Sequence, residues 1–146
     1  MKHSRIYVAW LATGVAAGAI ESAIKYSLQR KQFGKELASF QIIQEKLQRA
    51  LADVQSMIQM CLRVSQLYEQ GKASMGQIAM AKSYCTRVGR GVCQIAREVV
   101  GGNGILLEHH VVKQMMDMEG VHTYEGTYEI NSLVAAREIT GKSAFK

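Results

Sequence analysis

The apolar residues of this chain recur every three to four positions, which is the period of an amphipathic helix. Two runs of this pattern, on either side of Gly71, cover most of residues 40–99. The first run contains Phe40, Ile43, Leu47, Leu51, Val54, Ile58, Cys61 and Tyr68, and the second contains Ile78, Ala81, Cys85, Val88, Val92, Ile95 and Val99. We therefore predict two long helices, one from the cap Ser39 to about Gln70 and one from the cap Ser74 to Gly101-Gly102.

The pattern is different before residue 30, because residues 6–20 contain no charged side chain. These 15 residues are rich in Ala and Gly, and they fall short of the ~20 apolar residues that a membrane span requires. We predict a buried helix that Ser4 caps and that ends near Gln29. Gly14 and Gly18 would lie on one face and allow a neighbouring helix to approach closely.

Two shorter helices complete the chain, one from about Glu108 to Met118 and the other from about Tyr128 to Ile139, which Gly141 ends. Between them, Gly126 permits a turn and Thr127 can cap the last helix. Helices joined by brief polar links bury their apolar stripes most simply side by side. The prediction is an all-α fold, an antiparallel up-and-down four-helix bundle with a short extra helix, in a single domain of residues 1–146.

Composition supports this fold, since the chain has no proline and only 7% aromatic residues. Cys61, Cys85 and Cys93 lie inside apolar helical patterns, which predicts reduced core thiols of an intracellular protein. The histidines His109, His110 and His122 have no ligand partners at metal spacing, so no metal site is predicted.

The net charge of +6 indicates an anionic partner, and nucleic acid, an acidic membrane or a phosphorylated cofactor would each satisfy it. No cluster of Lys and Arg interleaved with aromatic residues is present. The absence of such a cluster favours solvated helix faces as the explanation of the charge. We therefore predict neither nucleic-acid binding nor membrane binding.

Three segments carry residues suited to chemistry. Glu125 precedes a helix and could act as a general base if apolar surroundings raised its pKa, although a helix N-terminus favours the charged carboxylate. Arg30 offers a cationic fork suited to a pyrophosphate, with Gln32 and Phe33 beside it. The glycines of 101–104 could let backbone N–H groups approach a phosphate. The alternatives are an exposed loop glutamate, a solvated helix end with one buried aromatic, and a simple helix end.

In their order and spacing, these segments resemble one known family. The segments are Arg30-Lys31-Gln32-Phe33-Gly34, Gly101-Gly102-Asn103-Gly104-Ile105 and Tyr124-Glu125-Gly126-Thr127. From about Arg5 onward the chain resembles the C-terminal helical domain of the acyl-CoA dehydrogenases. The ending Ala136-Arg137-Glu138-Ile139-Thr140-Gly141 is most similar to that of the glutaryl-CoA dehydrogenases.

The resemblance implies an FAD-dependent enzyme in which Glu125 removes the α-proton of an acyl-CoA thioester while a hydride leaves the β-carbon for the flavin. Some family members carry this base on the first helix, at the position aligned with Ser4, where serine cannot do that work. The resemblance places several residues against the FAD of a neighbouring subunit: Arg30, Gln32, Phe33, Gln41, Glu98, Gly101 and Gly102. It places Thr127 and Glu129 at the subunit's own FAD, and Arg5 and Gly126 at the acyl-CoA site.

The same resemblance implies a homotetramer, formed as a dimer of dimers, with an electron-transfer flavoprotein as the electron acceptor. It implies the cytoplasm of a bacterium or the mitochondrial matrix of a eukaryote. Family members also have an N-terminal helical domain and a middle β-domain, so we expect these 146 residues alone to be catalytically incomplete. An acyl-CoA oxidase domain and a non-catalytic helical oligomerisation module remain the alternative functions.

Overall fold

The computed structural model describes residues 2–145, and this part of the chain is almost entirely helical. The five α-helices are α1 (Lys2–Gln29), α2 (Gln41–Glu69), α3 (Met75–Val100), α4 (Val111–Thr123) and α5 (Tyr128–Thr140). The remaining elements are the two-residue antiparallel strands β1 (Lys31–Gln32) and β2 (Lys35–Glu36), and the 3₁₀ turns Leu37–Ser39, Gly101–Ile105 and Leu107–His109. The all-α prediction is confirmed.

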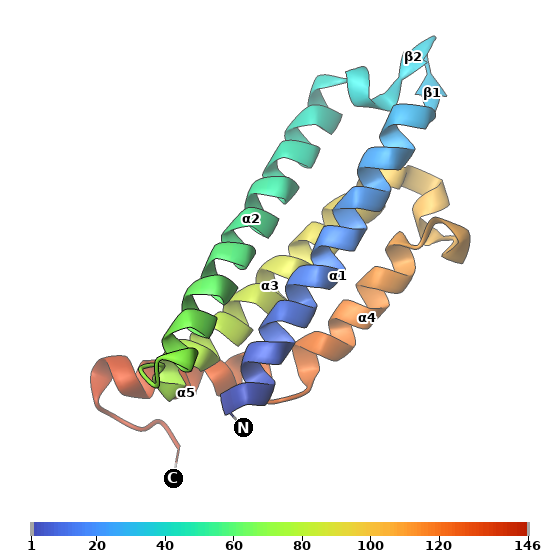
Figure 1. Cartoon of the computed structure of the whole chain (residues 1–146). Helices are drawn as coiled ribbons and strands as arrows, with labels where there is room; N and C mark the ends of the chain where they lie inside the picture. Colours follow the sequence, from blue (N-terminus) through green and yellow to red (C-terminus); the bar gives the residue numbers. More distant parts are fainter. Residues whose placement is uncertain (1, 146) are drawn as a thin grey trace.

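Helices α1 to α4 run alternately up and down and form an elongated bundle (Figure 1). A small hairpin, β1–β2, joins α1 to α2 at one end of the bundle. Helix α5 packs against α3 at the other end, close to the start of α1. The predicted bundle is therefore correct, and α5 is its short extra helix.

Helix α1 packs through a stripe of small side chains, in which each alanine is at most 1% exposed: Ala9, Ala12, Ala16, Ala19 and Ala23. Small side chains let α2, α3 and α4 approach its backbone closely. By length and composition this helix could cross a membrane, but half of its most apolar window is already buried inside the protein. Its apolar character is accounted for by the core.

The glycines of α1 do not both act as predicted. A Cβ at Gly18 would lie 2.9 Å from the side-chain nitrogen of Gln114 on α4, so this glycine does permit a close approach. The prediction for Gly14 was wrong, because this residue is exposed and a Cβ there would meet nothing within 4 Å. The alanine stripe, and not a glycine pair, makes the helix contact.

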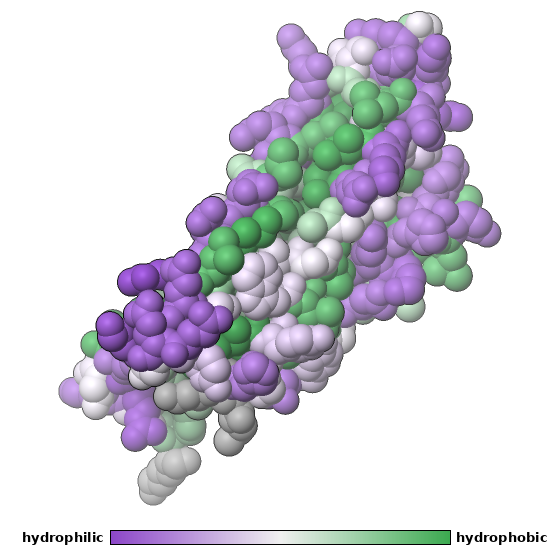
Figure 2. Space-filling view, viewed as in Figure 1, coloured by the Kyte–Doolittle hydropathy of each residue, from purple (hydrophilic) through white to green (hydrophobic). Residues whose placement is uncertain are grey.

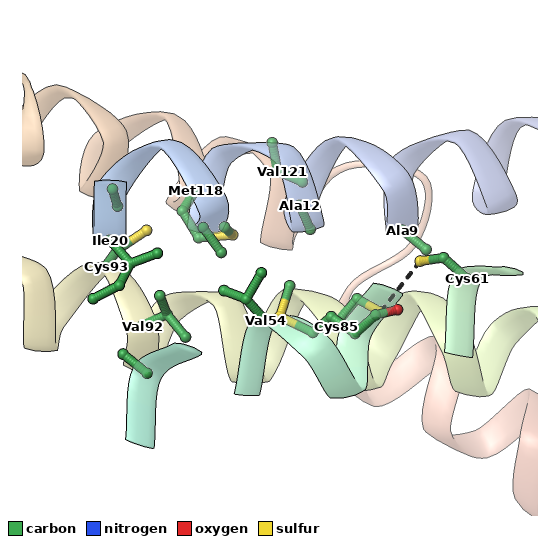
Figure 3. Packing of buried hydrophobic residues seen from close by; sticks show 14 of the residues in the cluster. Ala9, Ala12, Ile20, Val54, Cys61, Cys85, Val92, Cys93, Met118 and Val121 are labelled. Carbon is green, nitrogen blue, oxygen red and sulfur yellow. Dashed lines mark hydrogen bonds between the residues drawn. The ribbon is translucent and has the colours of Figure 1, made fainter. Parts of the chain in front are cut away.

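The core lies where α3 meets α1, α2 and α4 (Figure 3). The predicted stripe of α3 is buried except for the half-buried Val88. On α2, Val54 is buried as predicted, whereas Leu51 and Tyr68 are 45% and 38% exposed and Met57 is buried instead. Leucines occur on more than one face of α2, so three-to-four-residue steps can be drawn along two neighbouring stripes.

The three cysteines are buried free thiols, as predicted. The sulfur atoms of Cys61 and Cys85 lie 3.7 Å apart in the core, and Figure 3 shows this contact as a dashed line. Burial, with the nearby carboxylates of Glu119 and Asp117, raises the pKa of Cys93 to about 12. This thiol is therefore protonated at neutral pH and behaves as a core residue.

The predicted N-terminal caps of α3 and α5 are correct. Ser74 caps α3 in a reciprocal box with Gln77, with hydrogen bonds of 3.0 and 3.1 Å. Thr127 accepts from the backbone N–H of Ile130 at the start of α5. Gly141, at φ 69°, ends α5 in the left-handed conformation.

The predicted ends of α1 at Gln29 and of α2 near Gln70 are also correct, whereas the predicted starts of α1, α2 and α4 were displaced. Ser4 lies inside the first turn of α1, where its hydroxyl reaches across to the α4–α5 loop instead of capping. Ser39 belongs to a 3₁₀ turn, and Phe40 precedes α2 without a side-chain cap. Helix α4 begins at Val111 because His110 adopts φ 61°, a left-handed conformation that a helix cannot pass through.

Candidate active site

The loop between α4 and α5, residues 124–127, is built from two consecutive left-handed residues. Glu125 has φ 56° and Gly126 has φ 88°. A non-glycine residue at positive φ costs of order 1 kcal/mol or more, and it persists only when its surroundings hold it. We call residues 124–127 the Glu125 loop.

Glycine is required at position 126. A Cβ there would lie 3.0 Å from Nδ2 of Asn131 and 3.6 Å from a guanidinium nitrogen of Arg5. The predicted turn is confirmed, and the close approach of Arg5 to Gly126 brings together the two residues that the resemblance assigns to the acyl-CoA site.

The carboxylate of Glu125 is exposed and points toward the start of α1, where its Oε2 accepts a 2.9 Å hydrogen bond from the hydroxyl of Ser4. The two residues are 121 positions apart in sequence. They are the two positions at which the resemblance places the base in different family members. The fold therefore brings these alternative positions to one point in space.

Two buried side chains hold the Glu125 loop through hydrogen bonds to its backbone. Lys82 on α3 is fully buried, and its ammonium donates to the carbonyl oxygens of His122 at 2.9 Å and Gly126 at 2.6 Å. Asn131 on α5 is also fully buried, and its Nδ2 donates to the carbonyls of Gly126 at 2.8 Å and Thr127 at 3.0 Å. The loop backbone is thus fixed by side chains of two helices.

Sequence reasoning missed both of these residues. A signal for Lys82 was available, because it follows Ile78 by four positions and precedes Cys85 by three, and so it lies on the buried stripe of α3. Burial, followed by the neighbouring guanidinium of Arg5, lowers the pKa of Lys82 from 10.5 to about 8. Asn131 gave no such signal, because an asparagine in the first turn of a helix is ordinary.

Further polar groups surround the loop. The ring of His122 stacks on Tyr128 with centroids 6.0 Å apart, and its pKa is lowered by burial and then by the charges of Arg90 and Lys82. Glu129 is exposed, and hydrogen bonds from its own backbone N–H and from Thr127 lower its pKa. The lowered pKa of Glu129 agrees with its place in the first turn of α5, since a helix N-terminus favours a charged carboxylate.

The other predicted site residues lie at the opposite end of the bundle. Five of them line one hollow of about 390 Å³ between the hairpin and the end of α3: Arg30, Gln32, Glu98, Gly101 and Gly102. The carboxylate of Glu98 is engaged by Lys46 at 2.8 Å, and this hydrogen bond lowers the pKa of Glu98. The hollow thus brings together two segments that lie about 70 residues apart in the sequence.

Phe33 and Gln41 do not line this hollow. Phe33 is 92% exposed, with φ 52°, and its ring meets Phe40 edge-on at 6.3 Å. The alternative interpretation of a solvated helix end with a buried aromatic is wrong on this point. The ring of Phe33 is therefore almost entirely in contact with water.

The two groups of residues are separated by the whole length of α1. This helix has 28 residues, so it is about 42 Å long at ~1.5 Å per residue. Glu125, Thr127 and Glu129 lie near its first turn, and the hollow lies beyond its last (Figure 1). One chain therefore cannot bring both groups to the same small molecule.

The residues at the hollow suit a phosphorylated cofactor. Among residues 2–145, no ion pair engages the exposed guanidinium of Arg30, so it is available to an anion. The backbone of Gly101 and Gly102 carries no side chain that would keep a ligand away. Within the described part of the chain, no group of three or more His, Cys, Asp or Glu side chains could hold a metal ion.

Comparison with known proteins agrees with this geometry. The chain is 33% identical over 135 residues to the probable acyl-CoA dehydrogenase YngJ of Bacillus subtilis, covering 92% of this chain and 36% of that protein. It is 32% identical over 130 residues to the caffeyl-CoA reductase–Etf complex subunit CarC of Acetobacterium woodii, covering 89% and 34%. This chain thus spans about a third of the length of these relatives.

A solved structure shares the fold. The structure of a glutaryl-CoA dehydrogenase from Mycobacterium smegmatis in complex with FADH2 superposes with a TM-score of 0.93 and 29% identity, covering 97% of this chain and 37% of that one. Residues 1–140 match the family model described as "Acyl-CoA dehydrogenase, C-terminal domain". The chain therefore belongs to the acyl-CoA dehydrogenase family and corresponds to its C-terminal helical domain.

Proposed function

We propose that this chain supplies the catalytic base of an FAD-dependent acyl-CoA dehydrogenase, and that the base is Glu125. The observation that carries the proposal is the state of its carboxylate. It is exposed at the end of the bundle, Ser4 donates to one of its oxygens, and among residues 2–145 no salt bridge engages it. A carboxylate on a fixed backbone with a free lone pair is suited to accept a proton.

The reaction balances as an α,β-dehydrogenation. Glu125 takes the α-proton of the acyl thioester, and the electron pair of the broken C–H bond becomes the second bond between the α- and β-carbons. FAD, when bound, supplies the acceptor for the hydride that leaves the β-carbon. Arg5 and Gly126, which approach each other beside the base, would line the acyl-CoA site.

We propose glutaryl-CoA or another short-chain acyl-CoA as the substrate. The support is the similarity to the glutaryl-CoA dehydrogenase of Mycobacterium smegmatis together with the C-terminal motif. The relative CarC is named as a subunit of a complex with an electron-transfer flavoprotein, and we extend that class of electron acceptor to this chain. Such a protein would work in the bacterial cytoplasm or the mitochondrial matrix.

The proposed flavin contacts involve two subunits. Thr127 and Glu129 would contact the FAD of their own subunit. A second group at the far end would contact the FAD of a neighbour: Arg30, Gln32, Phe33, Gln41, Glu98, Gly101 and Gly102. The support is the separation of about 42 Å along α1, which is too long for one cofactor to bridge.

A homotetramer would provide the neighbouring subunit. Figure 2 shows apolar side chains gathered along the face of α1 and α2. Several large apolar residues of these helices are exposed, among them Tyr7 (67%), Ile42 (71%) and Leu51 (45%). Apolar surface of this kind is typical of protein interfaces, and it supports assembly through this domain.

Glu125→Gln tests the proposal, because glutamine keeps the size and hydrogen bonding of glutamate but cannot accept the proton. In the assembled, flavin-loaded enzyme we expect flavin binding to be retained and the anaerobic bleaching of flavin by glutaryl-CoA or butyryl-CoA to slow by about 10⁴-fold, the upper end for general-base catalysis. Glu36→Gln, at an exposed glutamate of β2 at the other end, is the matched control. Bleaching at the unaltered rate would remove Glu125 from this role, and hydrogen peroxide release in air would assign an oxidase.

A further inference from the structure

We propose that Lys82 is a positioning residue, which holds the backbone on both sides of Glu125 so that the carboxylate is presented to the α-carbon of the substrate. This inference rests on the proposed function of Glu125 as the base. Lys82 contacts neither the reacting atoms nor the exposed surface, since it is fully buried within the protein. It would act only through the Glu125 loop.

The geometry of the contacts carries the inference. The Lys82 ammonium donates to His122 O at 2.9 Å and to Gly126 O at 2.6 Å. His122 lies in the last turn of α4, where carbonyl groups have no partner within the helix and the helix dipole is negative. Gly126 directly follows Glu125. One cation therefore joins the end of α4 to the far side of the catalytic residue.

The loop needs such support because its backbone is strained and poorly bonded. Glu125 is in the left-handed region at φ 56°, where a non-glycine residue stays only if its surroundings impose it. Within residues 2–145, no backbone–backbone hydrogen bond other than that of Tyr124 to Gly120 is donated by residues 124–127. Asn131 contributes the second side-chain support, through the carbonyls of Gly126 and Thr127.

The choice of a lysine is informative because it is energetically unfavourable in this place. Removing an ammonium from water is unfavourable unless its hydrogen bonds replace the lost hydration. Burial and the nearby Arg5 lower the pKa of Lys82 to about 8, which is the signature of this cost. A methionine would fill the same space on the apolar stripe of α3 at no such cost. The fold therefore retains the charge for the contacts that it makes.

Lys82→Met removes both hydrogen bonds while keeping the length of the side chain. In the assembled enzyme we expect kcat to fall by about 10- to 100-fold, because a misplacement of ~1 Å at the reacting group has an effect of this size. The KM for acyl-CoA and the binding of FAD should change less than kcat, because the Glu125 loop supplies only some of the proposed contacts to either molecule. Thr86→Val is the matched control, since Thr86 is equally buried on α3 and its hydroxyl contacts only carbonyls of the same helix.

A double-mutant cycle separates positioning from a general structural role. If Lys82 acts through the carboxylate of Glu125, Lys82→Met should slow flavin bleaching in the natural background but cause less than about a twofold further loss in a Glu125→Gln background. An equal loss in both backgrounds would overturn the proposal. If Lys82→Met does not fold, Lys82→Gln, which keeps a shorter donor, is put through the same cycle.

The outcomes for the two residues are distinguishable. A Glu125→Gln enzyme with full activity would refute the proposed function. A Glu125→Gln enzyme that is inactive, beside a Lys82→Met enzyme with unaltered kcat, would refute only the role of Lys82.

Discussion

The two ends of the bundle present their functional residues in opposite ways. At one end, the Glu125 loop is held by the fully buried side chains Lys82 and Asn131. At the other end, the hairpin and its neighbours are exposed, and Phe33 leaves 92% of its surface in water. The first end is ordered by contacts within this chain, whereas the second has the exposed apolar side chain of a surface suited to bind a partner.

The two ends differ because the Glu125 loop has more contacts with the helical core than the hairpin β1–β2 has. The Glu125 loop lies against α1, α3 and α5, so its strained conformation is imposed from three sides. The hairpin β1–β2 has only two residue pairs, and an isolated two-stranded hairpin is at best marginally stable in water. This chain can therefore preorganise the proposed base and leave the proposed cofactor contacts to assembly.

The two ends should differ most in the stability that each loses when a glycine is replaced by alanine. Gly126→Ala introduces a Cβ at φ 88° that would lie 3.0 Å from the amide of Asn131. We expect it to lower the free energy of unfolding by about 3 kcal/mol, combining the cost of the left-handed backbone with damage to buried hydrogen bonds. Urea denaturation of this chain measures the effect.

Gly34→Ala is the matched variant at the other end, because Gly34 also has positive φ, 78°, but a Cβ there meets nothing within 4 Å. Only the backbone cost of about 1 kcal/mol should remain. Equal losses in the two variants would contradict the view that the Glu125 loop is the more tightly supported segment.

The next largest expected effect is a dependence of the free energy of unfolding on pH. The pKa of Lys82 falls from 10.5 to about 8 on folding, so between these values the unfolded chain binds this proton and the folded chain does not. Stability therefore rises with pH in this window, and below about pH 8 the contribution of this group is at its lowest. The advantage of the natural chain over Lys82→Met should grow by about 2–3 kcal/mol between pH 7.5 and 10.5.

Denaturation of both proteins at the two pH values measures this growth, and the titration of other groups cancels in the difference. A constant difference between them would show that Lys82 keeps an ordinary pKa and is not desolvated under the Glu125 loop.

The smallest effect concerns the exposed end. Arg30→Ala should leave the free energy of unfolding within about 0.5 kcal/mol, as expected for an exposed side chain. In the assembled enzyme it should weaken FAD retention by about 1.5 kcal/mol, the lower range for a hydrogen bond to a charged group. Fluorescence of released flavin measures retention. Arg49→Ala, at an exposed arginine about two turns into α2 that pairs with Glu45, should change neither quantity. Unchanged FAD retention in Arg30→Ala would remove Arg30 from the flavin site.

The helices themselves could be predicted from sequence because their causes are local. The period of apolar residues, the absence of proline and caps such as Ser74 and Thr127 act within a few positions, and the structure places them as predicted. The boundaries failed where a single backbone conformation decided the outcome, as at His110 with its positive φ. Such a conformation has no reliable signature in the residue type.

The sequence by itself determined the all-α fold, the family and the segments that carry the candidate site, because period, turn residues and motif order are written along the chain. Only the tertiary structure decided which of these residues meet. The contact of Ser4 with Glu125 joins positions 121 residues apart, and the burial of Lys82 under Gly126 joins positions 44 apart. Contacts of this kind depend on how the stripes of several helices pack together, and this packing makes a lysine on the buried stripe of α3 the support of the loop between α4 and α5.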